Sequence, residues 1–170
     1  MIEAWFDGAC WPNPGGHSSC GALIKRDGVT IWEHAEYLGD GQVSNNSAEY
    51  AGLVAVMRQL VVLGIQDATI YGDSDLVIQQ MSGRWKAKTK RRPIYLSNYN
   101  LVANLKIQLP RLQYKWIPRE ENTEADFLST QPLRDLGLRP DYSVSRSQSN
   151  VFRSNNELDT LFEAALVRSD

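Results

Sequence analysis

The hydrophobic positions at the start of the chain follow the pattern of short strands. Apolar residues dominate 2–10 and 19–25, and the Pro- and Gly-rich segment 11–16 between them predicts a turn. Asp27-Gly28 is a strong hairpin signal between apolar runs, and it predicts a third strand over 29–37. The chain is therefore expected to open with three antiparallel strands.

The spacing of apolar residues becomes helical over 46–63, and Gly64 suits the end of that helix. The later elements expected from the same reasoning are a strand over 68–71, a helix over 76–81, a helix over 95–109, a strand over 112–117 and a short helix over 122–129 stopped near Pro132. Three strands followed by alternating helices and strands predict an α/β fold, with a mixed sheet and helices packed on it.

The composition changes beyond Pro132, so we expect one domain over 1–131 and a polar linker over 132–154. Helical periodicity returns over 155–168, where apolar residues form one stripe: Leu158, Leu161, Phe162, Ala165 and Leu166. An isolated helix of this length is marginal in water. We expect this C-terminal amphipathic helix to dock on its own domain, on a protein partner, or on a second copy of the chain.

The overall composition is that of an ordinary globular chain, with 42% hydrophobic and 22% charged residues. No apolar run approaches the roughly 18 residues of a membrane span, and the first residues do not resemble a secretory signal. We therefore expect a soluble, cytoplasmic protein without a membrane partner. Cys10 and Cys20 lack metal-site or disulfide-framework spacing, which favours reduced and buried thiols.

Positive charge gathers in one short segment, although the formal net charge is −2. A third of the 18 cationic residues lie within 84–92: Arg84, Lys86, Lys88, Lys90, Arg91 and Arg92. Alternation of Arg84, Lys86, Lys88 and Lys90 would place these cations on one side of an extended chain, where they could follow phosphates. The alternative is a solvated loop with no ligand.

Four acidic residues stand at positions that are difficult to explain as solvated surface. Asp7 lies in the first apolar strand, two positions after Trp5, and Asp73 follows a short buried strand. Glu49 shares the apolar face of the helix over 46–63, and Asp126 lies in the short helix after the last strand. Singly, each acid could be a cap or a turn residue. Together, converging carboxylates repel one another unless a cation such as Mg²⁺ neutralises them.

Four sequence motifs, in order, resemble those of type 1 ribonuclease H. They are the run Phe6-Asp7-Gly8-Ala9-Cys10 with Asn13-Pro14-Gly15-Gly16, the run Asn45-Asn46-Ser47-Ala48-Glu49, the turn Gly72-Asp73-Ser74-Asp75, and the segment 116–126 that ends at Asp126. They cover about the first 130 residues. The resemblance implies a five-stranded mixed sheet flanked by helices.

The resemblance also implies an activity, which is endonucleolytic hydrolysis of the RNA strand of RNA/DNA hybrids. The family's metal-binding carboxylates correspond to Asp7, Glu49, Asp73 and Asp126, which would hold two Mg²⁺ ions, with Mn²⁺ able to substitute. Cleavage would leave 5′-phosphate and 3′-hydroxyl ends. Hybrid contacts would come from Asn13, Asn45, Asn46 and the backbone near Gly8 and Gly15, and from a basic segment with Arg84, Trp85, Lys86 and Lys88.

Asparagine is suited to such contacts because it donates and accepts hydrogen bonds, as the 2′-hydroxyl of RNA does. The same residues could instead serve as turn or cap residues, with Asn45 or Asn46 capping the following helix. Many bacterial and eukaryotic relatives carry a histidine in the catalytic loop, shortly before the last acid, and this chain lacks it. Its histidines are His17 and His34, so none precedes the last acid, and the chain resembles the histidine-free, archaeal-type subgroup.

In place of that histidine, another residue of this chain would assist product release. Arg119, Glu120 and Glu121 are the candidates, and the sequence does not choose among them. Asp75 stands where relatives commonly have a glutamine that contacts the hybrid.

The alternative function is a non-catalytic or partner-dependent nucleic-acid-binding module of a reverse transcriptase or replication complex. Retention of all four acids favours the enzyme.

Overall fold

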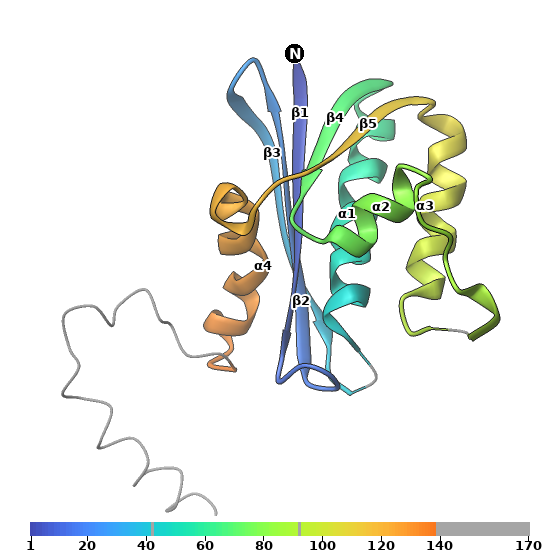
Figure 1. Cartoon of the computed structure of the whole chain (residues 1–170). Helices are drawn as coiled ribbons and strands as arrows, with labels where there is room; N and C mark the ends of the chain where they lie inside the picture. The colour runs from blue at the N-terminus through green and yellow to red at the C-terminus, as the bar shows by residue number, and fades with distance from the viewer. Residues whose placement is uncertain (42, 92, 139–170) are drawn as a thin grey trace, which may run out of the picture. The chain divides into compact units, whose positions relative to one another are not determined.

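The sheet of this protein is mixed and five-stranded, as predicted. A computed structural model describes residues 1–138 apart from residues 42 and 92. The elements are β1 (Ile2–Trp11), β2 (His17–Arg26), β3 (Val29–Gly39), α1 (Asn45–Val62), β4 (Asp67–Gly72), α2 (Asp75–Met81), α3 (Leu96–Gln108), β5 (Arg111–Trp116) and α4 (Thr123–Asp135). The strand order is β3-β2-β1-β4-β5, with β1, β2 and β3 antiparallel and β4 and β5 parallel to β1 (Figure 1).

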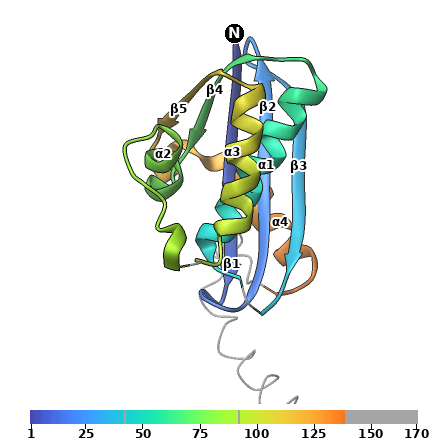
Figure 2. The ribbon, with the colours of Figure 1, turned by 90° about the vertical axis from the view of Figure 1, so that its right-hand side faces the viewer.

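Helices cover both faces of the sheet. α1 and α3 lie on one face and α4 lies on the other, as the two views show (Figures 1 and 2). The main core fills the space between the sheet and α1, where Phe6, Leu53 and Ile70 are fully buried. A smaller cluster under α4 contains Leu23 and Leu128, with Trp5 packed against it. Within residues 1–138, no described helix has the length and apolar character needed to cross a bilayer.

Two glycines in the central strands let the helices approach the sheet closely. A Cβ atom on Gly8 would lie 2.1 Å from the backbone nitrogen of Glu49 in α1. A Cβ atom on Gly21 would lie 2.2 Å from the backbone nitrogen of Ser129 in α4. Both distances are far below van der Waals contact, so a side chain at either position would push a helix away from the sheet.

The predicted boundaries hold for most elements, and the end of α4 is the main exception. The helix runs through Pro132 to Asp135, because Leu133 is fully buried and the Leu136 N–H donates to the Pro132 carbonyl at 3.2 Å. The domain boundary expected after residue 131 therefore falls inside a helix. Residues 139–154 of the expected linker lie outside the described residues, and so does the whole expected C-terminal amphipathic helix, residues 155–168. The docking of that helix stays a prediction.

The cap of α1 also differs from expectation. Ser44 is the N-cap residue, and its hydroxyl accepts a hydrogen bond from the Ser47 N–H at 3.3 Å. Asn45 and Asn46 therefore do not cap the helix, and their side chains remain available for other contacts. The predicted end of the helix is confirmed, because α1 ends at Val62 and Gly64 has a φ of 66°.

We predict that Gly21→Ala destabilises the protein more than Gly28→Ala does. The first substitution forces the backbone of α4 away from the sheet, at a cost of about 1–3 kcal/mol or more. The second adds a methyl group in open space at a φ of 81°, where the cost is about 1 kcal/mol of backbone strain. Urea unfolding measures both values, and an equal or smaller destabilisation by Gly21→Ala would contradict the close approach of α4.

Candidate functional site

Two carboxylates meet between the central strands β1 and β4 because of the register between them. The last parallel pair places Trp5 opposite Tyr71, and the two rings stack with centroids 5.2 Å apart. Asp7 and Asp73 each follow two residues later. Since side chains alternate along a strand, Asp7 projects to the same face as the Trp5 ring from the middle of β1, just past the last pair with β4. Asp73 follows directly after the carboxyl end of β4 and so lies next to it.

Glu49 joins these two acids from α1. The absence of a side chain at Gly8 allows the first turns of the helix to lie against β1, and the nearby Gly8 backbone N–H acts to lower the pKa of Glu49, against the larger effects that raise it. Carboxylate oxygens of Asp7, Glu49 and Asp73 all lie within 4.8 Å of one another. Three of the four predicted acids are therefore brought together.

The fourth acid, Asp126, lies beside this cluster and is held by an ion pair. Its Oδ1 accepts a hydrogen bond from the Arg119 guanidinium at 2.6 Å, and its side chain is 33% exposed. The negative charge of Asp126 still contributes to raising the pKa of Asp7. Asp126 therefore lies within electrostatic range of the cluster, while Arg119 neutralises it locally.

Burial and mutual repulsion disfavour the ionised forms of two of these acids. Burial raises the pKa of Asp7 to about 7, with the charges of Asp73 and Asp126 adding to the rise and a hydrogen bond from Ser129 opposing it. Burial, Asp7 and Asp73 together raise the pKa of Glu49 well above its ordinary value. The structure therefore holds these carboxyl groups where only a proton or a cation relieves the repulsion.

The arrangement fits a hard divalent cation. Among the described residues, the Glu49 Oε2 atom is buried without a hydrogen-bond partner. An unpaired buried acceptor beside two further carboxylates is a donor set that Mg²⁺ and similar ions prefer, because they take oxygen ligands. Asp7, Glu49 and Asp73 are thus the residues that could hold such an ion, and Asp126 could join them if Arg119 released it.

The predicted polar contacts surround the same acids. A cavity of about 590 Å³ is lined by the three carboxylates together with Gly8, Asn13, Asn45, Asn46, Asp75 and Arg119, among others. The Asn45 N–H donates to Asn13 Oδ1 at 3.2 Å, and Asn45 Nδ2 donates to Glu49 Oε1 at 3.4 Å. Gly15 is not among the lining residues, and its N–H donates to the Val43 carbonyl at 2.9 Å.

The basic segment does not reach this cavity. Arg84, Trp85, Lys86 and Lys88 are exposed and belong to no helix or strand, and the Trp85 side chain is 48% exposed. The alternation expected to continue to Lys90 is wrong, because Thr89–Arg91 forms a 3-10 turn. The expected alternation needs an extended chain, and the 3-10 turn interrupts it at Lys90.

Two residues that position the acids were not predicted as part of the site. Asn122 is 1% exposed, and its Nδ2 donates to Asp73 Oδ1 at 2.9 Å and to the Phe6 carbonyl at 3.0 Å. Ser129 is fully buried, and its hydroxyl donates to Asp7 Oδ2. The available signal was the spacing of Ser129, three residues after Asp126 and thus on the same side of a helix.

Comparisons with known proteins agree with this geometry. Residues 5–131 match the family model described as reverse transcriptase-like. The chain is 38% identical over 133 residues to the bifunctional protein Rv2228c of Mycobacterium tuberculosis, covering 78% of this chain and 35% of that protein. It is 30% identical over 146 residues to a ribonuclease H of Bordetella pertussis, covering 78% of this chain and 89% of that protein.

The fold is also similar to that of a solved structure. LC11-RNase H1, crystallised in complex with an RNA/DNA hybrid, superposes with a TM-score of 0.72 and 28% identity, covering 80% of this chain and 99% of that chain. The present chain spans only about a third of the length of the first curated relatives it matches.

The raised pKa of Asp7 predicts how stability depends on pH when divalent cations are removed. The folded state holds the Asp7 proton more tightly than the unfolded state does, so the free energy of unfolding falls as pH rises from about 4 to about 7. The fall attributable to Asp7 is at most about 4 kcal/mol, at roughly 1.4 kcal/mol per pKa unit. Asp7→Asn should therefore be more stable than the native chain near about pH 8 and no more stable near about pH 4.

Urea unfolding in a chelating buffer at the two pH values measures this difference. Asp40→Asn, at an exposed carboxylate, is the control and should change neither value. If Asp7→Asn showed the same pH dependence as the native chain, the carboxylates would not be under mutual repulsion.

Proposed function

Because this chain belongs to the ribonuclease H family, we propose that it hydrolyses the RNA strand of RNA/DNA hybrids with divalent cations bound to its buried carboxylates. One observation carries the proposal. Asp7, Glu49 and Asp73 bring their oxygens within 4.8 Å of one another, beside the carboxyl end of β4. Such a cluster is unfavourable without a cation, so it is better explained by cation binding than by stability.

The ions proposed are two Mg²⁺, with Mn²⁺ able to substitute. When bound, such ions activate a water molecule and stabilise the leaving 3′ oxygen, so the products would carry 5′-phosphate and 3′-hydroxyl ends. Asp7, Glu49 and Asp73 would hold the ions, and Asp126 would contribute once its ion pair with Arg119 opens. Opening of that ion pair would free Asp126 Oδ1 as a ligand, and a bound cation would then offset the carboxylate charge that Arg119 now offsets.

The chain's own groups orient the carboxylates and the substrate. Ser129 fixes one oxygen of Asp7, and Asn122 fixes one oxygen of Asp73, so neither acid can rotate freely. The Asn13 and Asn46 side chains line the cavity beside them and can pair with a 2′-hydroxyl, which is both donor and acceptor. Recognition of RNA would thus occur at the cavity that holds the acids.

Arg119 connects two parts of the proposed site. It lines the cavity of the carboxylates and also a smaller cavity of about 390 Å³ with Glu120, Thr123 and Asp126. A cation at this position can balance the charge of a phosphate. Of the three residues considered for product release, Arg119 is the one that reaches both cavities, so we assign this assistance to it.

We predict that Asp73→Asn keeps the fold and lowers magnesium-dependent hybrid cleavage by about 100-fold to 1,000-fold, the usual range when a group that stabilises the transition state is removed. The amide cannot supply the negative charge that the carboxylate shares with a cation. Initial rates on RNA/DNA, RNA/RNA and DNA/DNA duplexes, with and without Mg²⁺, measure the effect.

The matched control is Asp67→Asn, at the opposite end of β4 and exposed, which should cleave like the native chain. Near-native cleavage by Asp73→Asn would refute the carboxylate site. Hybrid binding without cleavage by the native chain would favour the non-catalytic module instead.

Neutralising the basic segment should weaken hybrid binding without altering the cation site. With Arg84, Lys86 and Lys88 changed to Gln, the slope of log K against log salt should fall by a little less than about one unit for each phosphate that the segment no longer binds. The control changes Arg26 and Arg111 to Gln, because these two cations lie at the other end of the sheet. An unchanged slope would mean that the segment is a solvated loop.

A further inference from the structure

A second group of possible metal ligands lies outside the carboxylate site. Cys20 in β2 and His34 and Glu36 in β3 each offer one ligand atom, and these atoms all lie within 4.8 Å of one another. The group combines a sulfur, a nitrogen and an oxygen donor. We propose that Cys20, His34 and Glu36 form a binding site for a single transition-metal ion of the zinc class.

The strand register explains why the three side chains converge. Cys20 pairs with Glu36 and Ala22 pairs with His34 across the antiparallel strands β2 and β3. Residues directly opposite each other project to the same side of a sheet, and residues two apart on one strand do so as well. The convergence therefore rests on backbone pairing over several residues and not on the conformation of one flexible side chain.

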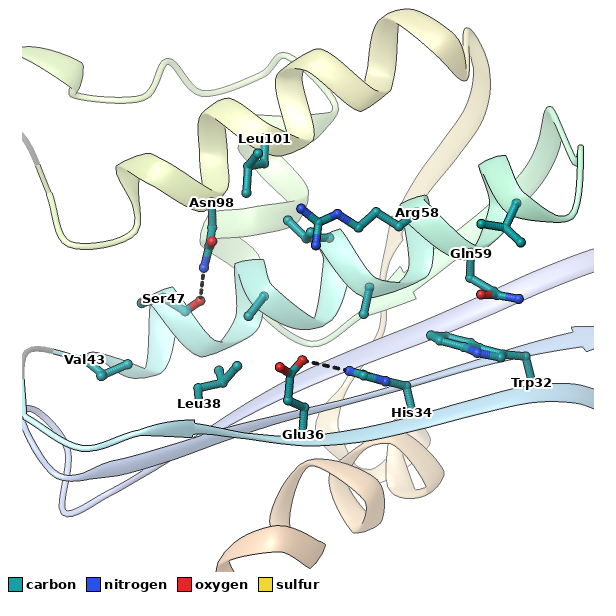
Figure 3. A pocket seen from close by; sticks show the side chains of 14 residues that line it. Trp32, His34, Glu36, Leu38, Val43, Ser47, Arg58, Gln59, Asn98 and Leu101 are labelled. Atoms are coloured by element: carbon teal, nitrogen blue, oxygen red, sulfur yellow. Dashed lines mark hydrogen bonds and ion pairs between the residues drawn. The ribbon is translucent and has the colours of Figure 1, made fainter.

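The three donors differ in burial in a way that suits capture of an ion from solution. Cys20 is fully buried beneath α1, whereas the side chains of His34 and Glu36 are 30% and 55% exposed. His34 Nε2 lies 3.1 Å from Glu36 Oε2, and both residues line a cavity of about 580 Å³ between β3, α1 and α3 (Figure 3). Cys20 does not line that cavity, so an ion would reach the thiol past His34 and Glu36, and a water molecule in the cavity could serve as fourth ligand.

The donor set discriminates between metals. Zinc and similar ions accept thiolate and imidazole ligands in four-coordinate sites, whereas Mg²⁺ takes oxygen ligands. The carboxylate cluster of Asp7, Glu49 and Asp73 offers oxygen alone. The two sites are thus chemically distinct, and excess Mg²⁺ can saturate the carboxylates while leaving the sulfur-containing site free.

The electrostatic surroundings of Cys20 are acidic. Burial raises the pKa of Cys20 to about 12, with further contributions from Glu36, Asp7 and Glu49. The group is therefore a neutral thiol before the ion arrives, and on binding its proton leaves to solvent as the sulfur–metal bond forms. The opposing charge in the cavity is Arg58 of α1, which is exposed and whose guanidinium lies on the α3 side, away from the His34–Glu36 pair (Figure 3).

Cobalt(II) is the probe that tests the site, because thiolate ligation gives an intense charge-transfer absorption that oxygen ligands do not give. The full chain, stripped of metal and kept in excess Mg²⁺, should develop this absorption with one cobalt ion per chain. Cys20→Ala should abolish it, and His34→Gln or Glu36→Gln should weaken cobalt binding by at least about 10-fold to 100-fold, since even outer-shell changes have effects of that size.

Matched controls use the other cysteine and the other histidine. Cys10 has its thiol directed at the Pro12 carbonyl, and His17 pairs with the Tyr37 hydroxyl, so Cys10→Ala and His17→Gln should keep the absorption. Circular dichroism verifies that each variant is folded. If Cys20→Ala does not fold, the variants at the more exposed His34 and Glu36 decide the question.

A second measurement uses zinc itself. With the carboxylates kept saturated by excess Mg²⁺, zinc should raise the thermal unfolding midpoint of the native chain and of Cys10→Ala, since the ion stabilises the folded state that holds it, and should not raise that of His34→Gln. The proposal is overturned if no thiolate absorption develops, if Cys10→Ala rather than Cys20→Ala removes it, or if zinc raises the midpoints of native chain and His34→Gln equally.

Discussion

The parallel register between β1 and β4 is the constraint on which the site depends. It places Trp5 opposite Tyr71, and so Asp7 level with Asp73. A slip of one residue would turn one acid to the other face of the sheet, because side chains alternate along a strand. Such a slip would also move Ile70 out of the main core, where it is fully buried. The hydrophobic core therefore fixes the positions of the charged groups of the site.

The acids are held together against their own repulsion by several local features. Gly8 permits the approach of α1, and Asn122 and Ser129 restrain the carboxylates of Asp73 and Asp7. Burial and like charge both oppose ionisation there. The free energy for this arrangement comes from the apolar packing of the sheet against α1 and α4. Apolar packing thus stabilises the domain, whereas repulsion among the clustered carboxylates destabilises it.

Much of this arrangement could be predicted from the sequence, and the misses have physical reasons. Alternating and helical periodicities located the five strands and the main helices, and the four motifs located the acids. The ion pair between Arg119 and Asp126 could not be predicted, because it depends on how the chain turns between β5 and α4. The continuation of α4 past Pro132 was missed because burial of Leu133 outweighs the local preference of proline.

The partners of Asp7 and Asp73 are distant in sequence, and this affects how the chain acquires its site. Ser129 is 122 positions from Asp7, and Asn122 is 49 positions from Asp73. During synthesis the N-terminal strands leave the ribosome first, and the α4 segment follows near the end of the domain. A nascent chain that has already paired β1 with β2 and β3 still lacks the groups that orient its acids. The order of translation therefore delays the complete site until the rest of the domain has been made.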